Sequence, residues 1–125
     1  MLITTKQNKM TIIDEKAFME TFQYFDKSIV VEIIDIFIQE YPDRIASISK
    51  DIESKDFARL KFDAHSLKGV ISNFFAAQPQ QYARELELKG ASKDGEGLPE
   101  LLENLSRTTK TLTEELIMMR QRFVS

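Results

Sequence analysis

Apolar residues recur along most of this chain at the three- and four-residue spacing that is typical of helices. Residues 14–26 carry phenylalanines at this spacing after an acidic first turn. A second helix is predicted to start with Ser28 as its N-cap and to run to Tyr41. Pro42 then either begins a new helical turn or bends a longer helix that continues to Ile52.

The middle of the chain predicts two more helices. Asp56 can cap a third helix that ends near Ala77. Pro79 suits the first turn of a short fourth helix over residues 80–89, because proline is tolerated where the backbone N–H has no helical partner.

A glycine-rich segment, GASKDGEG at residues 90–97, holds three of the four glycines and is the one clear flexible loop. After it, Pro99 opens a long last helix with apolar side chains in two heptad rows. The rows are Leu98, Leu105, Leu112 and Met119, and Leu102, Leu116 and Phe123, with Thr109 interrupting the second. No segment alternates with the period of a strand. The pattern predicts an all-α antiparallel bundle with short connections.

Composition narrows the class of protein. A chain of 125 residues with 42% hydrophobic and 30% charged residues is about one globular domain. The net charge of −3 gives no general attraction to nucleic acid or anionic membrane. The absence of cysteine excludes disulfides and thiolate metal sites. The apolar stretches are too short to span a bilayer, and the N-terminus lacks the apolar core of a secretory signal. We therefore expect a cytoplasmic protein without nucleic-acid or membrane partners.

The single histidine, His65, lies within the stretch FDAHSLKGVISNFF. On a helix, the apolar stripe that should face the core comprises Leu60, Ala64, Leu67, Ile71 and Phe74. His65 lies about 130° from the middle of that stripe, so it should be exposed. Gly69 is predicted on the same exposed side, although glycine costs a helix interior about 1 kcal/mol relative to alanine. That glycine leaves open space through which another molecule can reach the ring.

Neutral imidazole is a good nucleophile near pH 7, and its attack on a phosphoryl group gives an anionic phosphoramidate. Lys68, one turn from His65, can offset that charge. The sequence shows no nearby carboxylate to orient the imidazole, which argues against a general-base triad. Ser66 is adjacent in sequence but points away on a helix. A metal site would need further ligands, and the chain has no second histidine and no cysteine.

The hexapeptide AHSLKG, residues 64–69, resembles the signature of histidine-containing phosphotransfer (HPt) domains. The short first helix, the acidic-Pro-acidic step EYPD at residues 40–43 and the final helical hairpin also follow that family's pattern. The resemblance covers roughly residues 12–120. It implies an antiparallel four-helix bundle with a short extra N-terminal helix, formed by residues 12–123 after a flexible N-terminus at residues 1–11.

Position by position, the resemblance makes His65 the phosphoacceptor, Lys68 its charge partner and Gly69 the residue that provides clearance. It implies a monomeric phosphoryl carrier rather than an enzyme, without a nucleotide site or cofactor of its own. The partners would be receiver domains of response regulators or a hybrid histidine kinase, with Mg²⁺ supplied by the receiver. The chain departs from the family pattern at Phe75, where a second glycine is usual.

A docking surface is predicted beside the histidine. Phe62 falls about 170° from the core stripe, so its ring should stand in solvent. Lys61, Ser66, Lys68 and Ser72 would form a polar and basic rim that steers an acidic receiver pocket.

The second helix carries more apolar residues than one packing stripe requires, namely Ile29, Val30, Ile33, Ile34, Phe37, Ile38 and Tyr41. This arc is either deeply buried between two neighbours or partly exposed as a docking patch. A helical adaptor that binds a signalling partner without chemistry, a degenerate HPt fold, is the alternative function.

Overall fold

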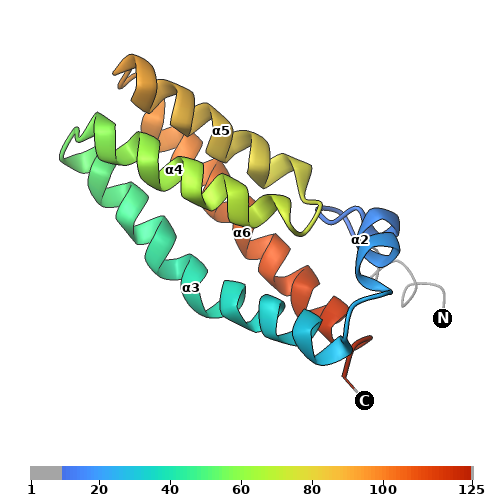
Figure 1. The fold of residues 1–125 in the computed structure, drawn as a ribbon. Helices are drawn as coiled ribbons and strands as arrows, with labels where there is room; N and C mark the ends of the chain where they lie inside the picture. Colours follow the sequence, from blue (N-terminus) through green and yellow to red (C-terminus); the bar gives the residue numbers. More distant parts are fainter. Residues whose placement is uncertain (1–9, 125) are drawn as a thin grey trace.

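The computed structural model describes residues 10–124, which form helices joined by short turns and contain no strand (Figure 1). The helices are α2 (Glu15–Phe22), α3 (Lys27–Glu53), α4 (Phe57–Ser72), α5 (Ala77–Ser92) and α6 (Leu98–Arg120). The four long helices close into a bundle in which α3 packs against α4, α4 against α5, α5 against α6 and α6 against α3. Short α2 lies at one end of this bundle. The prediction of an all-α four-helix bundle with a short extra N-terminal helix is confirmed.

The N-cap of helix α3 lies two residues before the predicted one. Asp26 is the N-cap, and its Oδ1 accepts hydrogen bonds from the backbone N–H of Ser28 at 2.9 Å and from its hydroxyl at 2.8 Å. The prediction of Ser28 was wrong because an aspartate two positions earlier offers a stronger acceptor to the same helix start. Pro42 lies inside one continuous helix, so the longer-helix alternative is the correct one.

Helix α4 begins as predicted, with Asp56 accepting from the backbone N–H of Arg59 at 3.1 Å. It ends at Ser72, earlier than the predicted end near Ala77. The chain turns at Phe75, whose φ of 59° is left-handed and incompatible with continuing the helix. The ring of Phe75 packs edge-on against Phe22, with centroids 6.5 Å apart. At this position, where the family pattern usually has glycine, the half-buried phenylalanine thus contributes a packing contact.

Helix α5 is longer than the predicted segment at both ends, so the loop before α6 begins after Ser92 and not at Gly90. Gly90 is buried where α5 meets α4, and a Cβ there would lie 2.8 Å from the backbone nitrogen of Lys61. This glycine therefore permits close helix packing instead of a flexible loop. The close approach of α4 and α5 matters for the site, since it brings side chains of both helices within hydrogen-bond reach.

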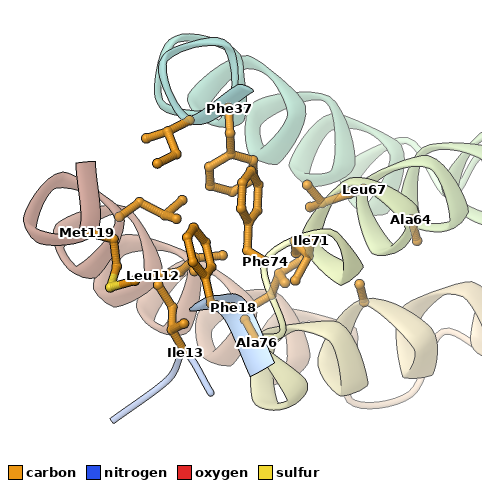
Figure 2. Packing of buried hydrophobic residues seen from close by; sticks show 14 of the residues in the cluster. Ile13, Phe18, Phe37, Ala64, Leu67, Ile71, Phe74, Ala76, Leu112 and Met119 are labelled. Atoms are coloured by element: carbon orange, nitrogen blue, oxygen red, sulfur yellow. The ribbon is translucent and has the colours of Figure 1, made fainter. Parts of the chain in front are cut away.

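The core follows the predicted stripe. Leu60, Ala64, Leu67, Ile71 and Phe74 are all buried, and Figure 2 shows the last four of them in the core. On α6 the first heptad row is buried throughout, whereas Leu102 of the second row is half-buried. Thr109, which interrupts that row, is also buried and donates its hydroxyl to the carbonyl of Leu105 at 2.8 Å. The buried hydroxyl is thereby satisfied.

Glu115 on α6 holds the segment that precedes α2 in place. Its buried carboxylate accepts from the backbone N–H groups of Thr11 at 2.8 Å and Ile13 at 2.9 Å. The N–H of Asp14 donates to the carbonyl of Phe75 at 2.9 Å, which ties the same segment to the α4–α5 turn. Of the predicted flexible N-terminus, residues 1–9 lie outside the described residues. The predicted domain limits stay a prediction.

Candidate functional site

His65 projects from the face of α4 opposite the core, and 67% of its side chain is exposed. Its position confirms the helical count. Gly69, one turn later, is exposed as well, and a Cβ added there would meet nothing within 4 Å. The absence of a side chain at Gly69 therefore serves no internal packing contact and leaves the approach to the imidazole open.

A carboxylate from the neighbouring helix reaches the imidazole. Oε2 of Glu87 on α5 lies 2.8 Å from Nδ1 of His65, and Oε1 of the same carboxylate accepts from Nζ of Lys68 at 2.6 Å. The expectation that no carboxylate lies near the imidazole was therefore wrong. Glu87 is 22 positions from His65, so no helical spacing could relate the two; only the packing of α5 on α4 brings them together.

The charge state of Glu87 follows from these contacts. The hydrogen bond from Lys68 is the main cause that lowers the pKa of Glu87 from its ordinary value; partial burial opposes this effect, and the bond to His65 adds to it. An ionised carboxylate can only accept hydrogen bonds, so Nδ1 of His65 must carry the hydrogen. In the neutral imidazole the lone pair is then on Nε2.

An open cavity of about 420 Å³ lies beside the imidazole. It is lined by Ala58, Lys61, Phe62, His65 and Glu87. The ring of Phe62 is 72% exposed, as the helical count predicted. The structure thus brings Lys61, Phe62 and Lys68 to the same side of the molecule as His65.

The two serines of the predicted rim have other partners. The hydroxyl of Ser66 accepts from Nη1 of Arg44 on α3 at 2.9 Å, so it faces α3. The hydroxyl of Ser72 donates to the carbonyl of Gly69 at 2.6 Å, within α4 itself. Neither serine lines the cavity beside His65.

The apolar arc of α3 is mostly, but not entirely, buried. Val30, Ile34 and Phe37 are buried, and Ile33, Ile38 and Tyr41 are half-buried. Ile29 of the arc, and Ile36 outside it, are each 46% exposed. A second cavity, of about 220 Å³, lies between α3 and α4. Its lining includes the apolar side chains of Ile33, Ile36 and Val70 and also polar and charged groups. It shares no lining residue with the cavity beside His65.

Comparison with known proteins places this geometry in a family. The family model of the Hpt domain matches residues 32–121, well over half of the chain. The chain belongs to the Hpt domain family. A crystal structure of histidine-containing phosphotransfer protein B (HptB) from Pseudomonas aeruginosa PAO1 matches with a TM-score of 0.82 and 24% identity. The match covers 91% of this chain and 98% of that chain, which shows a common fold. A comparison with curated proteins found no match.

Hpt domains are phosphoryl carriers that exchange the group with receiver domains and kinases, so this Hpt protein functions in histidine phosphotransfer within a phosphorelay. Proteins of this family are carriers and not enzymes in the classical sense. Within residues 10–124, none of its helices combines the length and the apolar character that a membrane span requires.

Proposed function

We propose that His65 is the phosphoacceptor and that it takes a phosphoryl group on Nε2 from the phosphoaspartate of a receiver domain or hybrid kinase. It then passes the group to the aspartate of another receiver. The observation that carries the proposal is the contact between Nδ1 of His65 and Glu87 at 2.8 Å, because it directs the lone pair of the neutral imidazole to Nε2 on an exposed ring.

The transfer needs no proton to leave the protein. The Nε2–P bond forms as the donor's O–P bond breaks, and the donor aspartate departs as a carboxylate. The hydrogen on Nδ1 stays in place, and the positive charge that develops on the ring faces the carboxylate of Glu87. In the second half of the relay the same bonds break and form in reverse.

Lys68 supports the phosphoryl group in this proposal. Its ammonium is half-buried and is held at 2.6 Å by Glu87. Lys68 is three positions after His65 on one helix, which places both side chains on neighbouring parts of the surface. The ammonium can therefore offset the negative charge of the phosphoryl oxygens without losing its own counter-ion.

We propose that the receiver docks over Phe62 and the cavity beside His65. Exposed aromatic rings are frequent anchors in interfaces, and Lys61 adds positive charge for an acidic partner. Magnesium would be supplied by the receiver, and the carrier would have neither a cofactor nor a nucleotide site of its own. A monomeric state and a cytoplasmic location remain predictions.

Phosphorylation of a His65→Gln variant tests the function. Incubation with a phosphorylated receiver should label the wild type and leave the variant unlabelled. Because the side chain is exposed, the free energy of unfolding of the variant should differ from that of the wild type by no more than about 0.5 kcal/mol. Labelling of the variant would show that another residue accepts the phosphoryl group. A wild-type protein that binds receivers and never accepts the group would be the non-catalytic helical adaptor instead.

Phosphorus NMR of the labelled wild type identifies the ring position. The two phosphohistidine isomers give separate signals, and we expect the Nε2 isomer alone. The Nδ1 isomer would contradict the role assigned to Glu87.

A further inference from the structure

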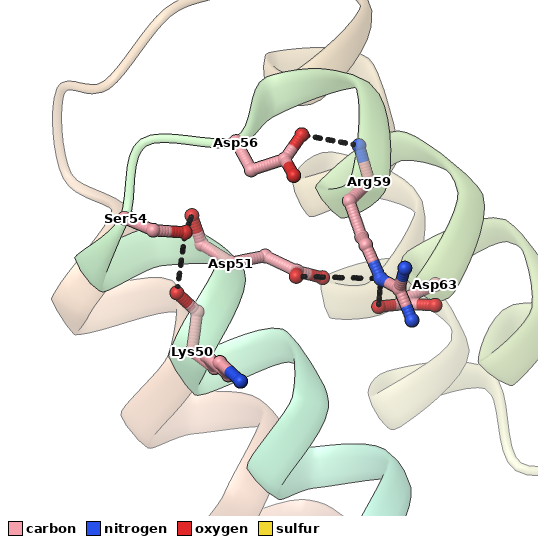
Figure 3. A network of polar contacts seen from close by, with 6 residues as sticks. All are labelled: Lys50, Asp51, Ser54, Asp56, Arg59 and Asp63. Atoms are coloured by element: carbon pink, nitrogen blue, oxygen red, sulfur yellow. Dashed lines mark hydrogen bonds and ion pairs between the residues drawn. The ribbon is translucent and has the colours of Figure 1, made fainter.

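A buried and a half-buried carboxyl group meet where the last turn of α3 faces α4 (Figure 3). Asp51 on α3 is only 5% exposed, and the side chain of Asp63 on α4 is 17% exposed. One oxygen of each group, Oδ2, is buried without a hydrogen-bond donor. In the part of the chain that the structure describes, these are the only buried side-chain oxygens or nitrogens that lack a partner.

Arg59 compensates these charges only weakly. Its Nε lies 4.0 Å from Oδ1 of Asp51 and 3.8 Å from Oδ2 of Asp63, beyond hydrogen-bond distance. Its side chain is 66% exposed, so water screens the attraction. Two ionised carboxylates in this position would repel each other and would leave both orphaned oxygens without a donor.

A single proton on this pair removes both the repulsion between the two carboxylates and the lack of a donor. A carboxylic acid donates one hydrogen bond, and the neighbouring carboxylate oxygen accepts it. We propose that Asp51 and Asp63 share one proton, and that this hydrogen bond is a pH-sensitive connection between the end of α3 and the helix that carries His65. Loss of the proton at alkaline pH loosens this end of the α3–α4 hairpin.

The electrostatic surroundings agree with the geometry. The pKa of Asp51 is raised to about 7, first by burial, then by the hydrogen bond to Asp63 and by the negative charge of Asp63. Asp56, at the N-cap of α4, also raises it, whereas Arg59 lowers it. These are the charged groups that act on Asp51 from α4 and its cap.

The sign of the pH effect follows from these directions. The ordinary pKa of an aspartate is 3.8, so between about pH 4 and pH 7 the folded state binds a proton that the unfolded state has already released. The stability of the fold therefore decreases as the pH rises through this window, and the penalty is complete above about pH 7.

Urea denaturation of wild type and Asp51→Asn at pH 5.5 and pH 8.5 tests the proposal. The amide of Asp51→Asn donates to Asp63 at every pH, so it replaces the shared proton permanently. From pH 5.5 to 8.5 the folding equilibrium of the wild type should weaken by up to about thirtyfold more than that of the variant, which is the effect of a folded-state pKa near 7. Comparing the two proteins removes the contributions of all other groups that titrate in both.

Asp43→Asn is the matched control, since Asp43 is an exposed aspartate of α3 whose side chain lies near Asp63 at the edge of a cavity. It should show the same pH dependence as the wild type. Equal pH dependence of wild type and Asp51→Asn would overturn the proposal.

Carbon NMR of the aspartate carboxyl groups in the wild type gives a second test that does not depend on any variant folding. We expect the signal of Asp51 to move with a midpoint near pH 7. An Asp51 carboxyl group that titrates below pH 5 would contradict a shared proton.

Discussion

Nδ1 of His65 lies 2.8 Å from Oε2 of Glu87, and this contact joins two helices across 22 positions of the chain. The same carboxylate holds the ammonium of Lys68 at 2.6 Å. Glu87 therefore sets the tautomer of the imidazole and the position of its neighbouring cation at once. Helix α4 alone could not hold His65 or Lys68 in this arrangement, because the carboxylate that binds both belongs to α5.

Removing the carboxylate should slow phosphorylation of His65. Hydrogen bonds to charged groups contribute roughly 1.5–3 kcal/mol, which corresponds to about 10- to 100-fold in rate if the bond is fully formed in the transition state. We expect a decrease of this order in Glu87→Ala, measured as the rate of transfer from a phosphorylated receiver. Glu85→Ala, on the same helix, is the control and should transfer at the wild-type rate. A normal rate in Glu87→Ala would restrict Glu87 to a structural role.

The stability that Glu87 provides should depend on pH in the direction set by its lowered pKa, of which the hydrogen bond from Lys68 is the largest cause. A carboxyl group with a lowered folded-state pKa stabilises the fold above its ordinary value, here 4.5, and loses this contribution as the pH falls through the folded-state pKa. The wild type should thus be more stable than Glu87→Ala at pH 7, with the difference shrinking in acid. Urea denaturation across pH 3–7 measures it. A difference in stability that stays constant across this range would show that ionisation of Glu87 does not contribute to the stability of the fold.

Lys68→Ala should shorten the lifetime of the phosphohistidine or slow its formation, because the phosphoryl oxygens lose their nearest cation. The lifetime can be followed by the loss of label from purified phosphoprotein. Lys110→Ala, which removes an exposed lysine from α6, controls for the change in net charge. Equal lifetimes and equal rates of formation in both variants would exclude a role of Lys68 in supporting the phosphoryl group.

A large residue in place of Gly69 should stabilise the fold and at the same time block phosphoryl transfer. Since a Cβ there meets no atom within 4 Å, Gly69→Gln should fold with up to about 1 kcal/mol more stability, the cost of glycine in a helix. Its side chain should nevertheless obstruct the receiver and block transfer. Gly69→Ala, with one methyl group, should gain stability and retain most of the transfer. Normal transfer in Gly69→Gln would show that clearance is not the reason for this glycine.

Phe62→Ala should weaken receiver binding by about 1 kcal/mol or more, as a modest interface anchor does. A small-molecule phosphodonor should still label His65, because the imidazole is unchanged. Ile117→Ala is the control, since Ile117 is 47% exposed on α6, which packs against α3 and α5. Titration of both variants against a receiver that phosphorylates the wild type decides the matter. Equal affinities would remove Phe62 from the interface.

The sequence by itself determined which face of each helix is buried. The stripe from Leu60 to Phe74, the exposure of His65 and Phe62, and the cap at Asp56 all follow from helical periodicity and local hydrogen bonding. These are properties of a single helix, so they can be read without knowing what packs against it. The hexapeptide at residues 64–69 likewise pointed to the Hpt family before any fold was known.

Only the tertiary structure decided which side chains of different helices meet. Gly90 was predicted in a loop, yet it is buried where α5 approaches the backbone of α4. Glu87 reaches His65, and Asp51 faces Asp63, because of the axial register and separation of packed helices. That register depends on how all the side chains of the bundle interlock. No local spacing encodes it, so the partner of the single histidine could not be predicted from its own helix.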